Sequence, residues 1–66
     1  MVIQLNGERR ELAPATTIAD LVRSLGWLPE QVAVEQNGRV VRRAEHATRA
    51  LATGDSIEVV TLVGGG

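Results

Sequence analysis

Two Asn-Gly dipeptides, at residues 6–7 and 37–38, place the strongest constraint on what this chain of 66 residues can fold into. Asn and Gly tolerate the positive φ angles that a two-residue hairpin turn requires. Each dipeptide lies between short β-prone segments, with residues 2–6 and 8–12 around the first and residues 32–36 and 39–43 around the second. The sequence therefore predicts two hairpins, with the charged segment 8–12 at a sheet edge.

One amphipathic helix is predicted between the two hairpins. Thr17 and Asp20 have the spacing of a capping box, in which each side chain accepts a hydrogen bond from the other residue's amide. Gly26 suits the left-handed residue that ends many helices, and Trp27 then packs back toward the last turn. The apolar stripe of this helix, at helical spacing, comprises Ile18, Leu21, Val22 and Leu25.

The remaining chain predicts a loop and one long strand. Residues 44–53 are expected to form a loop or a short helical turn anchored by Leu51, and residues 56–63 are the longest β-prone run. This order of elements predicts an α+β domain, a mixed sheet of about five strands with one amphipathic helix on one face. The expected core comprises Ile3, Leu5, Leu12, Ile18, Leu21, Val22, Leu25, Val32, Val34, Val40, Leu51, Ile57 and Val59.

The composition excludes several classes of function. The chain has no cysteine, one histidine and one aromatic residue, and all seven of its basic residues are arginine. Disulfides, thiolate nucleophiles and the aromatic platforms that bind single-stranded nucleic acid are therefore absent. No apolar run is close to the length of a membrane span, which is about 20 residues, and no signal peptide is evident. We expect no nucleic-acid or membrane partner and a cytoplasmic location.

Few side chains suggest catalysis. The single histidine, His46, lies in the predicted loop and is interpreted as a solvated residue, and no two carboxylates have a spacing that indicates acid–base work. Arg39, Arg42 and Arg43 could bind phosphate or an acidic partner, although a solvated hairpin face is the favoured interpretation. The sequence therefore predicts a protein that is not an enzyme and that binds no cofactor or metal itself.

The last strand and the second hairpin predict a docking surface. If residues 57 and 59 face the helix, Val60 shares the opposite face with Glu58. Val41 is expected to alternate outward, and Leu62 to become exposed through a bulge or fraying of the strand. Exposed apolar residues on an open sheet face suggest docking of another protein, although single exposed valines are also normal. The candidate docking residues are therefore Val41, Glu58, Val60 and Leu62.

The chain ends with Val63-Gly64-Gly65-Gly66. Because glycine has no Cβ, such a segment can thread a narrow channel and bring its carboxylate to a partner's reactive groups. Three extended residues reach about 10 Å. We expect residues 1–63 to form the domain and residues 64–66 a flexible tail, an arrangement typical of a carrier. A cloning remnant or a disordered end is the alternative interpretation.

The segments, taken in order along the whole chain, resemble the thiamine-biosynthesis sulfur carrier proteins, which are ubiquitin-like members of the β-grasp fold. Arg42 departs from that family, where a proline before an arginine is expected. The matching segments are Leu5-Asn6-Gly7-Glu8, Val32-Ala33-Val34-Glu35, Asn37-Gly38, Gly54-Asp55-Ser56-Ile57-Glu58-Val59-Val60 and Val63-Gly64-Gly65-Gly66.

The resemblance implies a function for the terminal glycines. Gly66 would be adenylated by a ubiquitin-activating-like adenylyltransferase that uses ATP and magnesium, and Gly64 and Gly65 would give access to that enzyme. Sulfur from a cysteine desulfurase would then replace AMP, and the resulting thiocarboxylate would donate sulfur to thiazole synthase. Because the sequence ends at Gly66, no proteolytic maturation is expected.

Two alternatives are compatible with the same features. The small subunit of molybdopterin synthase has a similar fold, a diglycine end and sulfur chemistry. The compact length and the Val63-Gly64 junction favour the thiamine family over it. A ubiquitin-like protein modifier or docking domain is the alternative of a different class.

Overall fold

The computed structural model describes residues 1–62, so Val63 and the expected tail at residues 64–66 lie outside the described residues. The described chain forms five strands, one α-helix and two short 3-10 helices. In chain order these are β1 (Val2–Leu5), β2 (Glu8–Glu11), α1 (Ile18–Ser24), η1 (Pro29–Gln31), β3 (Val32–Gln36), β4 (Arg39–Val41), η2 (Arg43–Glu45) and β5 (Ser56–Thr61).

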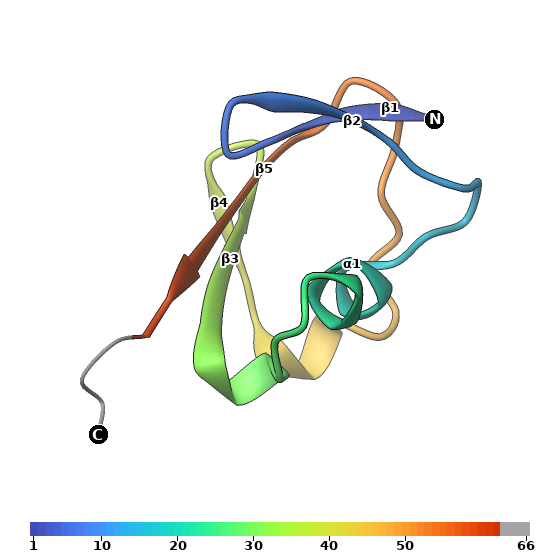
Figure 1. The fold of residues 1–66 in the computed structure, drawn as a ribbon. Helices are drawn as coiled ribbons and strands as arrows, with labels where there is room; N and C mark the ends of the chain where they lie inside the picture. Colours follow the sequence, from blue (N-terminus) through green and yellow to red (C-terminus); the bar gives the residue numbers. More distant parts are fainter. Residues whose placement is uncertain (63–66) are drawn as a thin grey trace.

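The strands form one mixed sheet in the order β2-β1-β5-β3-β4. Strands β1 and β5 are parallel, and the other neighbouring pairs are antiparallel. Helix α1 lies on one side of the sheet, and β5 runs through its middle (Figure 1). The α+β architecture predicted from the sequence is confirmed. Within residues 1–62, no helix has both the length and the apolar character needed to cross a membrane.

Both predicted hairpins are present. The turn residues have positive φ angles, at 50° and 82° for Asn6 and Gly7 and at 53° and 82° for Asn37 and Gly38. These are the angles of a two-residue turn whose twist matches that of the flanking strands. All four residues of β2 are exposed at the edge of the sheet, as its charged sequence predicts.

The ends of α1 follow the predicted capping chemistry. The Thr17 hydroxyl accepts a hydrogen bond from the Asp20 amide, and the Asp20 carboxylate accepts one from the Thr17 amide, both at 3.1 Å. The hydrogen bond from the Thr17 backbone is the main cause that lowers the pKa of Asp20. At the other end Gly26 has φ +85°, and the Trp27 amide donates to the Val22 carbonyl at 3.2 Å. Trp27 is 40% exposed and therefore packs only in part.

The core lies between α1 and the sheet and largely matches the expected set. Leu12, Leu25 and Val59, expected in the core, are partly buried against it. Its buried apolar residues are Ile3, Leu5, Ile18, Leu21, Val22, Val32, Val34, Val41, Leu51 and Ile57.

The two valines of β4 are reversed relative to the sequence prediction. Val41 is 5% exposed and belongs to the core, whereas Val40 is 71% exposed. The cause is the register of the second hairpin, which pairs Val34 with Val41 and Glu35 with Val40. Directly paired residues share a face of the sheet, so the buried Val34 brings Val41 inward. Val41 is therefore not part of a docking surface.

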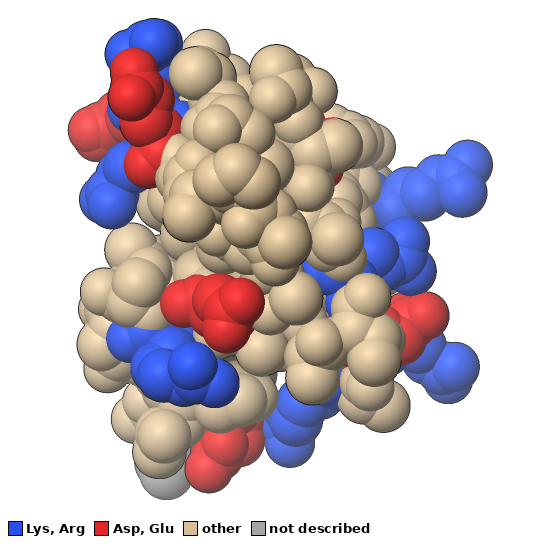
Figure 2. Space-filling model, turned by 90° about the vertical axis from the view of Figure 1, so that its right-hand side faces the viewer, with Lys and Arg blue, Asp and Glu red and all other residues tan. Residues whose placement is uncertain are grey.

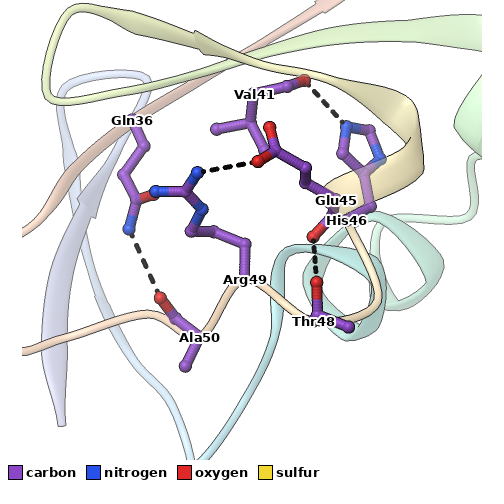
Figure 3. Close-up of polar contacts among 7 residues, drawn as sticks. All are labelled: Gln36, Val41, Glu45, His46, Thr48, Arg49 and Ala50. Atoms are coloured by element: carbon purple, nitrogen blue, oxygen red, sulfur yellow. Dashed lines mark hydrogen bonds and ion pairs between the residues drawn. The ribbon is translucent and has the colours of Figure 1, made fainter.

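His46 is also placed differently from its prediction. It is 4% exposed, so its interpretation as a solvated loop residue is wrong. Its Nε2 lies 3.2 Å from the Val41 carbonyl oxygen (Figure 3). Because a carbonyl only accepts, Nε2 must carry the proton. The His46 carbonyl in turn accepts a hydrogen bond from the Ala19 amide at 2.9 Å, so this residue links β4 to α1.

Candidate functional site

Strand β5, which leads toward the glycine sequence, is held on both sides. On the β1 side, the Gln4 amide donates to the Asp55 carbonyl at 2.9 Å and the Asn6 amide to the Ile57 carbonyl at 2.8 Å. On the β3 side the pairing continues past the strand, because the Leu62 amide donates to the Gln31 carbonyl at 2.8 Å. The backbone is thus fixed as far as Leu62.

The Asn6 side chain extends this support where β1 ends. Its Oδ1 accepts a hydrogen bond from the Val59 amide at 2.9 Å, and its Nδ2 donates to the Val59 carbonyl at 3.2 Å. An amide side chain carries the same donor and acceptor groups as a peptide unit. Asn6 therefore acts as one additional residue of β1 and pairs with the second half of β5.

The start of β5 is fixed by Asp55. Its carboxylate accepts hydrogen bonds from Gln36 Nε2 at 2.8 Å, from Asn37 Nδ2 at 2.9 Å and from the Ala52 amide at 2.8 Å. Burial acts to raise the pKa of Asp55, but these three hydrogen bonds outweigh it and the pKa is lowered. The Asn37 side-chain oxygen also accepts from the Ser56 amide at 2.9 Å, which ties the second hairpin to β5.

The sheet face opposite α1, here called the outer face, carries the predicted docking residues of β5. Glu58 is exposed, and Val60 and Leu62 are 60% and 52% exposed. Side chains two residues apart in a strand share a face, so Glu58, Val60 and Leu62 project together without any bulge. The expectation that Leu62 needs a bulge or fraying to become exposed is therefore wrong, although its exposure is confirmed.

Val40 adds to this surface from β4. It is paired with Glu35, and Glu35 is paired with Glu58, so these three residues form one row across the outer face. The prediction that Val40 belongs to the core is wrong, although the length of the Asn-Gly turn contains the information that places it outside. We call Val40, Val60 and Leu62 the outer apolar residues.

The described residues give no indication of a metal centre. Among residues 1–62, no group of three or more His, Asp or Glu side chains is placed to hold a metal ion. The other predicted site residues, Gly64, Gly65 and Gly66, lie outside the described residues.

Comparison with known proteins identifies the family. The model of the ThiS family matches residues 3–66. The chain belongs to the ThiS family. The match includes the final glycines as well as the sheet, so it covers both parts of the predicted carrier arrangement.

Solved structures of ThiS share the fold. The crystal structure of the thiamine biosynthesis protein ThiS from Geobacter metallireducens matches with a TM-score of 0.84 and 29% identity, over 100% of both chains. A solution NMR structure from the same organism matches with a TM-score of 0.82 and 29% identity, over 100% of this chain and 88% of that one. The ubiquitin-like β-grasp expectation is thereby confirmed.

The curated relatives are longer proteins. A thiazole synthase from Magnetococcus marinus is 46% identical over 66 residues, which is 100% of this chain and 20% of that protein. A thiazole synthase from Paramagnetospirillum magneticum is 36% identical over the same 66 residues, again 20% of its length. This ThiS-family chain therefore spans about a fifth of the length of these relatives.

Proposed function

We propose that this chain carries sulfur for the formation of the thiazole ring of thiamine, as a thiocarboxylate on Gly66. The observation that carries the proposal is the ThiS family match, which extends through the final glycines. The structural likeness to ThiS of Geobacter metallireducens, over the full length of both chains, supports it. In this proposal the chain is a co-substrate of partner enzymes rather than a catalyst.

The proposed chemistry begins with activation of the Gly66 carboxylate, which is a poor electrophile because its leaving group would be oxide. A carboxylate oxygen attacks the α-phosphorus of ATP, the bond to pyrophosphate breaks, and an acyl adenylate forms. A sulfur nucleophile then attacks the acyl carbon and AMP leaves with the bonding electrons, so a C–S bond replaces the C–O bond. A ubiquitin-activating-like adenylyltransferase binds ATP and magnesium, and a cysteine desulfurase supplies the sulfur as a protein persulfide. Attack by its outer sulfur gives an acyl disulfide, and a second thiol then cleaves the S–S bond, which releases the thiocarboxylate and leaves a disulfide.

Thiazole synthase is the proposed acceptor of the sulfur. In two relatives, a segment similar to this whole chain is part of a polypeptide named thiazole synthase. A segment joined to an enzyme is held at a high effective concentration beside it, which favours a shared reaction. The outer apolar residues Val40, Val60 and Leu62 offer a docking surface beside the strand that leads to the glycines.

The two rival functions receive less support. The small subunit of molybdopterin synthase shares the expected fold, but the matched family is ThiS and the two solved structures described above are of thiamine biosynthesis proteins. A ubiquitin-like modifier would form an amide with a lysine of a target protein instead of a thiocarboxylate. Incubation with activating enzyme, sulfur donor and each acceptor distinguishes thiazole, molybdopterin and protein conjugates as products.

The first test concerns the last residue. Deletion of Gly66 is expected to abolish ATP-dependent adenylation and to leave the unfolding transition unchanged, because the described fold is complete within residues 1–62. Intact-mass measurement of the protein from cells is expected to show sulfur in place of one terminal oxygen. Undiminished adenylation, or a native chain that continues beyond Gly66, would contradict the proposal.

Gly65 tests access to the activating enzyme. Gly65→Val adds a β-branched side chain that stiffens the backbone and fills a narrow channel, so thiocarboxylate formation is expected to stop. Gly65→Ala is the matched control, because it adds one carbon without branching. A normal yield from the valine variant would refute the argument from channel width.

The docking surface is tested at Val60. Val60→Asp places a charge among the outer apolar residues, and sulfur transfer to thiazole synthase is expected to fall about tenfold or more, as at a buried interface contact. Thr53→Asp is the control, because Thr53 is exposed in the loop before β5 and adds the same charge away from the outer face. Equal transfer by both variants would remove the outer face from the proposed interface.

A further inference from the structure

The charges of this chain are divided unequally along the sequence. Residues 39–49 contain four of the seven arginines and only one of the eight carboxylates, Glu45. All four arginines of this segment, Arg39, Arg42, Arg43 and Arg49, are exposed. In Figure 2, several blue side chains project from the right-hand side of the molecule with fewer red ones among them, whereas red and blue side chains intermingle closely at the upper left. The chain therefore has a basic side although its net charge is −1.

Most of these arginines are not engaged within the described chain. The ion pairs among residues 1–62 are Arg9–Glu11 at 3.1 Å, Arg23–Asp20 at 3.5 Å and Arg49–Glu45 at 3.2 Å. None of these pairs involves Arg39, Arg42 or Arg43. A cluster of like charges raises the local potential and attracts groups of the opposite sign.

The positive charge beside β4 exceeds what is needed to protect an open edge strand, as a comparison of the two edges of the sheet shows. Charged residues at an edge discourage pairing with other chains, and either sign serves that purpose. Edge strand β2 uses a balanced set, with two glutamates and two arginines. At the other edge, β4 begins with Arg39, and Arg42 and Arg43 follow it. Such an edge repels basic segments but attracts acidic ones.

A groove runs beside this basic edge. Its volume is about 580 Å³, and its lining includes Arg39 and Val40 of β4, Arg49 and Ala50 of the following loop, and Gln36 at the end of β3. Figure 3 shows the Arg49 side chain between Glu45, to which it donates at 3.2 Å, and Gln36. The Gln36 side-chain Nε2 donates to the Ala50 carbonyl at 3.4 Å and so connects β3 to the loop.

The backbone of β4 offers hydrogen bonds toward solvent. A two-residue hairpin makes the pair that closes its turn, Gln36 and Arg39, a hydrogen-bonded pair, and the next pair, Glu35 and Val40, is not hydrogen-bonded. The N–H and C=O of Val40 therefore point away from β3, at the outer edge of the sheet. An extended peptide can use such groups to add a strand.

From this placement we propose that the β4 edge binds an extended acidic segment of a partner protein. The segment lies in the groove, pairs with the backbone of Val40, and directs its carboxylates to Arg39 and Arg49, which both line the groove. Guanidinium groups bind carboxylates through two parallel hydrogen bonds, and alternate side chains of an extended segment share one face, about 7 Å apart, so they reach these two arginines. This binding is separate from the proposed sulfur transfer.

The test uses an alternating Glu-Thr peptide of about eight residues, the length of an ordinary strand. Titrated into ¹⁵N-labelled protein, it is expected to shift the amide signals of residues 39–43 and 49–50 most strongly. It is expected to bind about tenfold more tightly than a Gln-Thr peptide of the same length. Binding should weaken with added salt, because the charges involved are exposed.

Two matched double variants separate the groove from net charge. Arg39→Gln with Arg49→Gln is expected to weaken peptide binding about tenfold, because two exposed ion pairs are lost. Arg9→Gln with Arg10→Gln removes the same charge from the β2 edge and is expected to change binding less than about twofold. A charge-reversed variant, Arg39→Glu with Arg49→Glu, should instead bind a Lys-Thr peptide.

Four results would overturn the proposal. These are failure of the Glu-Thr peptide to bind, equal losses in the two Gln variants, signal changes centred on β2 or α1, and stronger binding of inorganic pyrophosphate than of the peptide. None of these measurements depends on ATP, sulfur or a partner enzyme. Loss of thiocarboxylate formation with intact peptide binding would instead contradict only the proposed function.

Discussion

Neighbouring valines in β4 provide a direct test of the hairpin register. Val41→Ala and Val40→Ala remove the same two carbons, but Val41 is 5% exposed and Val40 is 71% exposed. At about 0.8 kcal/mol for each buried carbon, Val41→Ala lowers the free energy of unfolding by about 1.6 kcal/mol, and a residual cavity raises this loss to about 2 kcal/mol. Val40→Ala changes it by less than about 0.5 kcal/mol, because most of that side chain is already in water.

Thermal unfolding followed by circular dichroism measures this difference. In a domain of this size, 1 kcal/mol corresponds to about 4–8 °C in Tm, so Val41→Ala is expected to lower Tm by about 10 °C and Val40→Ala by about 2 °C. Both substitutions lower β-propensity alike, so the difference reports burial. Equal shifts, or a larger shift for Val40→Ala, would refute the pairing of Val34 with Val41.

Two further predictions concern the supports of β5. Asp55 has a pKa lowered from 3.8, so its hydrogen bonds contribute stability that is present above that value and is lost as pH falls through the lower folded pKa. Urea unfolding should show Asp55→Asn to be about 2 kcal/mol less stable than the parent at neutral pH. This difference should shrink as the pH falls below 3.8 and through the lowered pKa, and a difference independent of pH would contradict this linkage. Asn6→Gly keeps a residue suited to φ 50° but removes both side-chain bonds to Val59. Amide exchange at Val59 is expected to accelerate about fivefold, equivalent to about 1 kcal/mol, and unchanged exchange would show that the Asn6 side chain does not support β5.

Features with local causes could be predicted from the sequence. The turns at Asn6 and Asn37 and the capping of α1 by Thr17 depend on residues within a few positions of one another. Such signals are complete before the chain folds, because the backbone angles and the capping hydrogen bonds are fixed by adjacent residues. Leu51 could also be predicted from its neighbours, because it is the one large apolar residue among small and polar ones. Its predicted role as the buried anchor of the loop is confirmed, since it is 6% exposed.

Features that depend on distant contacts were missed in two different ways. The inward placement of Val41 could have been predicted from the sequence, because a two-residue turn fixes which residues pair across the hairpin. Alternation within β4 alone shows that Val40 and Val41 lie on opposite faces but does not show which of them faces the core. The burial of His46 had no local signal. It results from contacts with Val41 in β4 and Ala19 in α1, which are brought together only by the complete fold.

For the candidate site, the period of β5 correctly predicted the exposure of Glu58 and Val60, because both positions are set by the inward position of Ile57. The adenylation and sulfur chemistry proposed for Gly66 come from the family alone, and neither periodicity nor burial bears on them. The outer apolar surface could therefore be predicted in β5 from the period of that strand alone, whereas in β4 the position of Val40 follows only from its pairing with Glu35 across the two-residue turn.

The outer face and the basic edge meet at Val40 but point in different directions. The Val40 side chain lies on the outer face, perpendicular to the sheet, whereas its free backbone groups lie in the plane of the sheet. A partner on the outer face meets apolar side chains beside β5, and an acidic segment at the edge meets arginines in residues 39–49. Because the two proposed contacts use different atoms and different forces, occupation of the edge does not by itself block a partner on the outer face.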